Sequence, residues 1–269
     1  MNISPFHYLY PDFSRISDEA AFFDQVRWLF PDQRAQGIYL GSDNSSLFVY
    51  RIKTATRIFH GIIAAIDIHD YLKGLIKKHE NTLTRQEENI SQLMIERQAI
   101  IKPVLIAYNE NKKIKELIAK SFLGVKPKFK LKFEKDGQIH EFFELSQKSR
   151  IAQFQKEFKS KVKRGYIADG HHRYDAALRF HRENGTPETE HVLSVLVSTD
   201  DPGLEIFPTH RLAAGPVPPL NGAFRLIELD GSAEAAFARL ADGSREHPAF
   251  VLVRPDAMTL AELTESPSD

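Results

Sequence analysis

The sequence predicts an α+β fold in which helices flank a mixed β-sheet. Segments with helical and strand character are interleaved along the whole chain. Two pairs of strand-like runs are also joined by short turns. Residues 46–52 and 57–68 are separated by the polar stretch KTAT, and residues 128–134 and 138–145 flank an Asp-Gly turn. Because strands joined by such turns are antiparallel, we expect the sheet to be mixed rather than purely parallel.

The remaining elements follow from local patterns. A helix is expected over residues 17–31, with Ser17 as N-cap and Pro31 at its end. Residues 70–101 are highly charged and predicted to be helical, with Leu93 and Met94 among the few apolar positions. Further helices are expected at 112–122, 147–158 and 171–180, and further strands at 37–41, 102–108, 165–168, 191–199 and 203–213.

Composition limits the classes of function. The chain has 269 residues, 42% of them hydrophobic, which is enough for a packed core. A net charge of zero argues against a broad electrostatic grip on nucleic acid. The absence of cysteine excludes disulfides and thiolate metal sites. No apolar run is long enough to span a membrane and no signal peptide is evident, so a cytoplasmic protein is expected.

Composition also changes along the chain, because no lysine follows Lys163. We therefore predict a main domain over residues 1–212 and a C-terminal α/β continuation over 213–269. The change is explained either by simple compositional drift or by a different origin or truncation of the C-terminal part. The C-terminal part still alternates strand and helix patterns, so it is expected to be folded up to a few polar residues at its end.

The segment GYIADGHHRYDAALRF, residues 165–180, combines a strand, a Gly turn and a helix. This places Gly170, His171, His172 and Arg173 at a helix N-terminus, where free N–H groups and the helix dipole favour an anion. Arg173 could bind phosphate with two parallel hydrogen bonds. The alternative is structural, with Asp169 as an ordinary N-cap and the two histidines on the surface.

A second candidate segment covers residues 76–93. His79 and Glu80 lie just before an expected helix start, with Thr82 or Thr84 as cap and Glu87 or Glu88 completing a capping box. One interpretation is a capped, solvated helix. The other makes Glu80 a general base or a metal-facing carboxylate with His79 beside it.

A third candidate, His210 with Arg211, follows a predicted strand, where ligand sites of α/β proteins often lie. The remaining histidines are scattered, and none has the spacing of a zinc-protease helix. We expect those to be surface or packing residues.

Taken together, these segments resemble domain-of-unknown-function family 1015. The resemblance rests on IADGHHRYDAAL, on SLFVYRI, on the block from His60 to Tyr108 and on DPGLEIFPTHRL, and it covers roughly residues 1–212. That family is similar to the wider ParB and sulfiredoxin-like group, which includes nucleotide hydrolases and a free-serine kinase. The resemblance implies a ParB-like core, to which the hairpin at 127–145 is an elaboration.

The resemblance also implies roles for individual residues. Gly170, His171, His172 and Arg173 match a loop that holds nucleotide phosphates. Glu80 and Asn81 match an earlier motif, in which Glu80 is the candidate base and Arg85 a further phosphate partner. A nucleotide such as ATP, ADP or CTP would bind with Mg²⁺ shared by Glu80 or Asp169, and His210 and Arg211 would complete the nucleotide site. The implied activity is phosphate transfer to an unknown small acceptor, or nucleotide hydrolysis.

Two other classes of function remain open at this point. A metal-dependent hydrolase could use His79, His171, His172 and His210, although adjacent histidines on a helix point in different directions. A regulatory or partition-type binding protein is the third possibility. The balanced charge and the lack of a recognisable DNA-binding module argue against DNA as a partner.

Overall fold

The computed structural model describes residues 1–134, 136–204, 220, 222–230, 232–241, 249–254 and 257–264. The chain divides into two compact units, Met1–Ile206 and Phe207–Asp269. The domain boundary that we predicted at residue 212 lies outside the described residues.

The first unit is built on one nine-stranded mixed sheet, which confirms the predicted α+β class. Eight strands lie in the order β6-β10-β7-β11-β5-β4-β9-β8, and β1 pairs with β5. Strand β10 is parallel to β6 and β11 is parallel to β7, whereas the other pairs are antiparallel. The bounds are β1 Ile3–Ser4, β4 Leu47–Lys53, β5 Ile58–Asp67, β6 Ile76–Lys77, β7 Val104–Tyr108, β8 Phe129–Phe133, β9 Gln138–Leu145, β10 Gly165–Asp169 and β11 His191–Ser198.

Both predicted hairpins are present. Strands β4 and β5 pair antiparallel, and so do β8 and β9. The second hairpin is part of the main sheet, because β9 also pairs with β4 along its length. A separate two-stranded sheet is formed by β2, Leu9–Pro11, and β3, Tyr39–Gly41.

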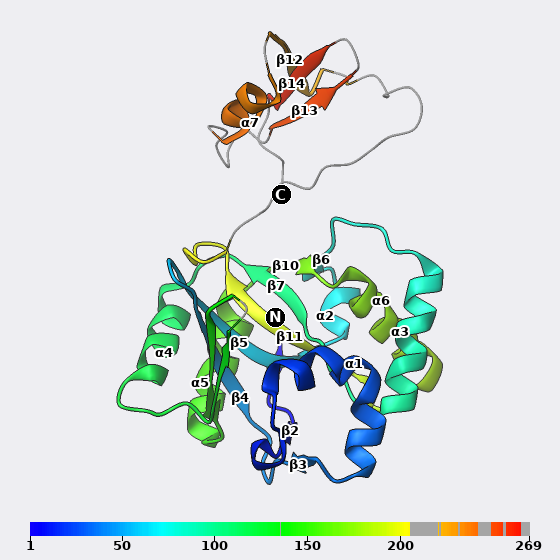
Figure 1. Ribbon diagram of the computed structural model, residues 1–269, viewed down its shortest axis with the longest axis vertical. Helices are drawn as coiled ribbons and strands as arrows, with labels where there is room; N and C mark the ends of the chain where they lie inside the picture. The colour runs from blue at the N-terminus through cyan, green and yellow to red at the C-terminus, as the bar shows by residue number, and fades with distance from the viewer. Residues whose placement is uncertain are drawn as a thin grey trace. The chain divides into compact units, whose positions relative to one another are not determined.

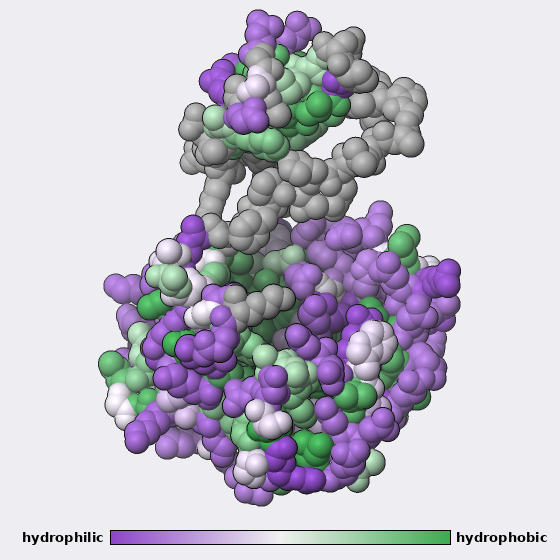
Figure 2. Space-filling model, in the orientation of Figure 1, coloured by the Kyte–Doolittle hydropathy of each residue, from purple (hydrophilic) through white to green (hydrophobic). Residues whose placement is uncertain are grey.

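Helices lie on two sides of the large sheet (Figure 1). Helices α4, Lys112–Phe122, and α5, Lys148–Lys161, lie on one side. Helices α3, Thr84–Arg97, and α6, His171–Asn184, pack against each other on the other side. The remaining helices of this unit are α1 Glu19–Ala35, α2 His69–Leu72 and the 3₁₀ turns Phe13–Arg15 and Pro187–Thr189. Hydrophilic side chains gather over α3 in Figure 2, as expected for its charged sequence.

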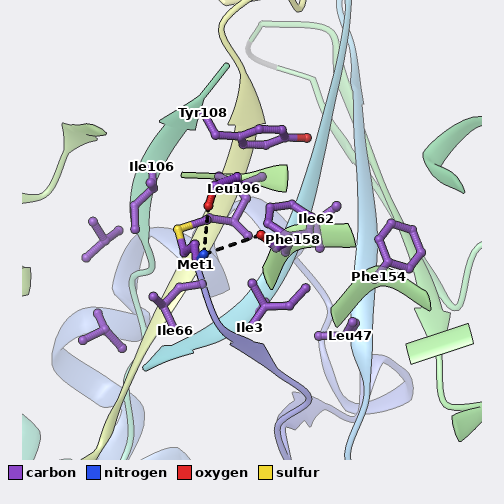
Figure 3. Close-up of a cluster of buried hydrophobic side chains, with 14 of the residues drawn as sticks. Met1, Ile3, Leu47, Ile62, Ile66, Ile106, Tyr108, Phe154, Phe158 and Leu196 are labelled. Atoms are coloured by element: carbon purple, nitrogen blue, oxygen red, sulfur yellow. Dashed lines mark hydrogen bonds between the residues drawn. The ribbon is translucent and has the colours of Figure 1, made fainter. Parts of the chain in front are cut away.

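The core lies between the sheet and helices α4, α5 and α6, and Figure 3 shows the part of it around α5. Met1 is inserted into it, and the Met1 amino group donates a hydrogen bond to the carbonyl of Val162 at 2.9 Å. This carbonyl follows the last turn of α5, where the helix dipole favours a positive charge. Burial nevertheless lowers the pKa of the amino group, and the charge of Asp70 opposes that effect.

The second unit is a three-stranded antiparallel sheet with one helix. Strand β14, Met258–Leu263, lies between β12, Phe224–Leu229, and β13, Ala249–Val253. Helix α7, Ala233–Ala241, contacts β13. Within the described parts of both units, no helix is long and apolar enough to cross a bilayer.

Several predicted element boundaries are wrong. Asp18, not Ser17, caps α1, because its carboxylate accepts a hydrogen bond from the Ala21 N–H at 2.9 Å. Pro31 lies inside α1, which continues to Ala35. The predicted helix over 70–101 is divided into α2, the short strand β6 and α3.

Candidate functional site

The strand–Gly–helix motif forms at the predicted place. Strand β10 ends at Asp169, Gly170 is the N-cap and α6 begins at His171. Gly170 has φ = +97°, a conformation that side-chain-bearing residues rarely adopt. Among the described residues no side chain caps this helix end, so the structural alternative with Asp169 as N-cap is wrong. The first-turn N–H groups of α6 are therefore left without a side-chain acceptor.

Arg173 folds back over Gly170. Its Nη2 donates to Asp169 Oδ2 at 2.6 Å, across one helical turn. A Cβ atom on Gly170 would lie 2.6 Å from Arg173 Nη2, so only glycine leaves room for the guanidinium. Burial would raise the pKa of Asp169, but the hydrogen bond and charge of Arg173, followed by the charge of Lys102, lower it overall. The Nε of Arg173 is buried and has no partner among the described residues.

His171 is the most enclosed polar residue of the motif. Only 5% of its surface is exposed, and its Nε2 has no hydrogen-bond partner in the described part of the chain. On the other side of the ring, Nδ1 lies 3.6 Å from Glu80 Oε2, and the His79 ring packs edge-on at 4.5 Å between centroids. Burial and then the charge of His79 lower the pKa of His171, against a smaller opposite effect of Glu80. Both effects favour the neutral form of the imidazole, which carries one N–H.

Asp175 of α6 forms hydrogen bonds with the loop that carries Glu80. Its Oδ2 accepts hydrogen bonds from Thr82 Oγ1 at 2.7 Å and from Lys78 Nζ at 3.2 Å. Next to it, the Leu83 N–H donates to His172 Nε2 at 3.2 Å. The two motifs that the sequence analysis singled out are thus in direct contact.

Helices α3 and α6 are joined further along their lengths. The buried Ser91 hydroxyl donates to the Ala176 carbonyl at 3.1 Å, and Arg179 forms an ion pair with Glu88 at 3.0 Å. The predicted capping box is absent, because Leu83 is the N-cap of α3 and no side chain in the described part of the chain caps this helix. Thr82 instead contacts both Glu87 and Asp175, since its position before the helix directs it toward α6.

A cavity of about 690 Å³ opens at the N-terminus of α6. Glu80 and the run from Asp169 to Arg173 line one part of it, so Glu80 and Arg173 share one site. One face of α3 forms a long wall, with Ile90, Leu93 and Met94 between Gln86 and Arg97. The other lining residues are Phe23, Val26 and Arg27 of α1 and the segment Ala99, Ile100, Ile101 and Lys102.

Not every predicted site residue belongs to this cavity. Asn81 and Arg85 are exposed and do not line it. His79 contributes through its contact with His171 rather than by lining the cavity. His210 and Arg211 lie outside the described residues.

The sequence analysis missed the contributions of α1 and the wall of α3. Positions 86, 90, 93, 94 and 97 recur at spacings of three and four, which places them on one face of a helix. This pattern was visible, but it indicates an ordinary packing face equally well. Lys102 and Arg27 carried no local signal at all.

Comparison with known proteins agrees with the motifs. A family model described as "Protein of unknown function (DUF1015)" matches residues 6–264. The chain belongs to this family. The match extends beyond residue 212, the limit of the resemblance seen in the sequence, and includes most of the second unit. Among curated proteins and among solved structures, no match was found.

For this DUF1015 protein, the described residues contain no group of three His, Asp or Glu side chains placed to hold a metal ion. Of the four histidines considered for a metal-dependent hydrolase, His79 and His171 meet ring to ring. His172 has one ring nitrogen engaged with the backbone of Leu83. The site offers the first-turn N–H groups of α6, the imidazole of His171, the guanidinium of Arg173 and the carboxylate of Glu80.

Replacing Gly170 by alanine tests the tight approach of Arg173. We expect Gly170→Ala to reduce the free energy of unfolding by about 1–3 kcal/mol, through backbone strain and displacement of the guanidinium. Gly185→Ala is the matched control, because Gly185 ends the same helix with φ = +61° but has nothing within 4 Å of its would-be Cβ. Urea unfolding should show a larger loss for Gly170→Ala, and equal losses would contradict the role of Arg173.

The lowered pKa of His171 predicts a pH dependence of stability. The unfolded chain binds a proton at the ordinary pKa near 6.5, whereas the folded state resists it. The free energy of unfolding should therefore fall as the pH drops below about 6.5, until the lowered folded-state pKa is passed. Urea titrations between pH 7.5 and 4.5 should show a smaller fall for His171→Asn, while His172→Asn, which keeps the buried imidazole, should follow the wild type.

Proposed function

We propose that this cavity binds a nucleotide through its phosphates and that the protein is a phosphotransferase or a nucleotide hydrolase. The observation that carries the proposal is the pair of buried, unpartnered nitrogens, His171 Nε2 and Arg173 Nε, at the uncapped end of α6. Buried polar groups normally have partners, so polar atoms left without one beside a cavity are what a bound ligand could satisfy.

A phosphate group fits the donors at this end of the cavity. The first-turn N–H groups of α6 and the positive end of its dipole favour an anion. Lys102 lines the same cavity and adds positive charge beside Asp169. A phosphate would also compete with Asp169 for Arg173, because guanidinium binds both groups with the same geometry.

The rest of the cavity suits the less polar part of a nucleotide. Phe23, Ile90, Leu93 and Met94 provide aromatic and aliphatic surface for a base. The volume of about 690 Å³ lies within the range of small-molecule sites, roughly 300–1,000 Å³. These features support a nucleotide over a free phosphate, but they do not select the base.

Glu80 is the proposed general base. Its side chain is half exposed and lines the cavity, and its Oε2 lies 3.6 Å from Nδ1 of His171, near the phosphate end. In that place it could accept the proton of an acceptor hydroxyl or of water as the oxygen attacks phosphorus. Lys78 and Thr82, on either side of Glu80, both donate to Asp175. These bonds restrict the motion of Glu80, as the positioning of a general base requires.

Mg²⁺ is compatible with the residues of this site. Glu80 and Asp169 are two carboxylates with open access to one cavity, and Mg²⁺ is commonly held by one or two carboxylates together with phosphate oxygens. The ion would supply charge neutralisation for the phosphates. Asp169 would become available to it once phosphate had taken Arg173.

Removal of Arg173 should weaken phosphate binding with the fold intact. We expect Arg173→Ala to reduce affinity for ATP, ADP or CTP by about 10- to 100-fold, the value of one or two charge-assisted hydrogen bonds. Isothermal titration with each nucleotide, with and without Mg²⁺, measures this. Arg85→Ala removes an exposed arginine near the start of α3 and should leave affinity unchanged; no binding by the folded wild type would refute the proposal.

Neutralising Glu80 should separate binding from chemistry. In Glu80→Gln, nucleotide affinity measured without Mg²⁺ should stay within a few-fold of the wild type, while phosphate release or transfer with Mg²⁺ falls by about 10²–10⁴-fold. Single-turnover assays with radiolabelled nucleotide measure the chemical step directly. An unchanged rate would remove Glu80 from the mechanism and leave the phosphate-binding end standing.

A further inference from the structure

The cavity has a second cationic group, at the far end of the α3 wall. Gln86 and Arg97 both line the cavity, and the helix rise of 1.5 Å per residue separates them by about 16 Å. Gln86 lies in the first turns of α3, close to Leu83, which contacts α6 through His172. Arg97 is the last residue of α3, where Arg27 of α1 joins it. The apolar residues Ile90, Leu93 and Met94 lie between the two ends.

Arg97 is anchored by a backbone carbonyl of α1 that a proline leaves without a helical partner. Pro31 lacks an N–H, so the carbonyl of Arg27, four residues earlier in α1, has no helical partner. Arg97 Nη2 donates to this carbonyl. The guanidinium of Arg97 is thereby fixed to α1 next to the side chain of Arg27.

The two guanidinium groups have no carboxylate partner among the described residues. Glu96, the acid nearest to Arg97, accepts a hydrogen bond from Gln92. The Arg27 guanidinium lies over the Trp28 ring at 4.9 Å. Burial and then the charge of Arg27 lower the pKa of Arg97, and Glu96 offsets this only in part. Two like charges at a cavity wall repel each other, and an anion bound between them would offset that repulsion.

The C-terminal dipole of α3 does not account for both arginines. Arg34 already donates to the Arg97 carbonyl at 3.1 Å and so supplies a positive group at that helix end. Satisfying the Arg27 carbonyl would need only one neutral donor. Neither the bond from Arg34 nor the bond to the Arg27 carbonyl therefore explains why Arg97 is charged or why the Arg27 side chain lies beside it.

We propose that Arg27 and Arg97 form a second anion-binding position, at the end of the cavity away from α6. The ligand class that fits is an elongated molecule with a phosphate at one end, an apolar or aromatic middle and a second anionic group at the other end. The identity of the first end rests on the proposed phosphate site at α6. The second position stands on the two arginines alone.

A matched pair of synthetic probes tests this directly. The first is 4-p-terphenylyl phosphate, and the second is the same molecule with a carboxylate on the para carbon of the distal ring, 4″-carboxy-4-p-terphenylyl phosphate. Isothermal titration of the full chain should show about tenfold tighter binding of the carboxylate probe, as expected for a charge-assisted hydrogen bond. This gain should disappear in Arg97→Gln and in Arg27→Gln.

Arg27→Gln keeps the backbone carbonyl that anchors Arg97, so it guards against a loss caused by altered helix packing. Arg85→Gln, also on α3 but outside the cavity, should keep the full gain. Equal binding of both probes by the wild type, or a gain that survives both substitutions, would overturn the second position and leave the phosphate site intact. A gain that persists while Arg173→Ala changes neither affinity would overturn the phosphate site and support the second position. Binding of neither probe would reject both.

Discussion

The site depends on one backbone conformation, the left-handed Gly170 between β10 and α6. Because this residue has no side chain, Arg173 can fold back over it and reach Asp169. The same turn leaves the first N–H groups of α6 without a side-chain cap among the described residues. It also places His171 against the segment of His79 and Glu80, where its imidazole is buried. A helix end with free donors, a buried histidine and a paired arginine all meet at this single glycine.

The second requirement is a set of polar contacts between α6 and the segment before α3. Asp175 bonds Thr82 and Lys78, and the Ser91 hydroxyl bonds the Ala176 carbonyl in a buried position. Such contacts have little net effect on stability, but leaving any one partner alone is costly. They therefore select one alignment of the two helices, and that alignment places Glu80 beside His171.

Features set by neighbouring residues were predictable from the sequence, and features set by distant contacts were not. The hairpins and the strand–Gly–helix motif depend on local turn chemistry, and they formed as expected. The cap of α3 failed because Thr82 finds a partner 93 residues away in Asp175. By local rules Pro31 should end its helix, yet α1 continues past it. Arg97, which is distant in sequence, donates to the Arg27 carbonyl that Pro31 leaves without a helical partner. The cavity-lining face of α3 could not be distinguished from a core-packing face, because both place side chains at spacings of three and four residues.

The contact between Lys78 and Asp175 spans 97 residues of sequence, and this has an evolutionary consequence. The intervening chain includes α4, the β8–β9 hairpin and α5, and β8 and β9 lie at the opposite edge of the sheet from β10. Insertions or deletions in that hairpin would not disturb the direct bonds between the two motifs. Homologues are thus free to vary in length there while keeping the same site, so the separation of the motifs in sequence carries little information about their distance in space.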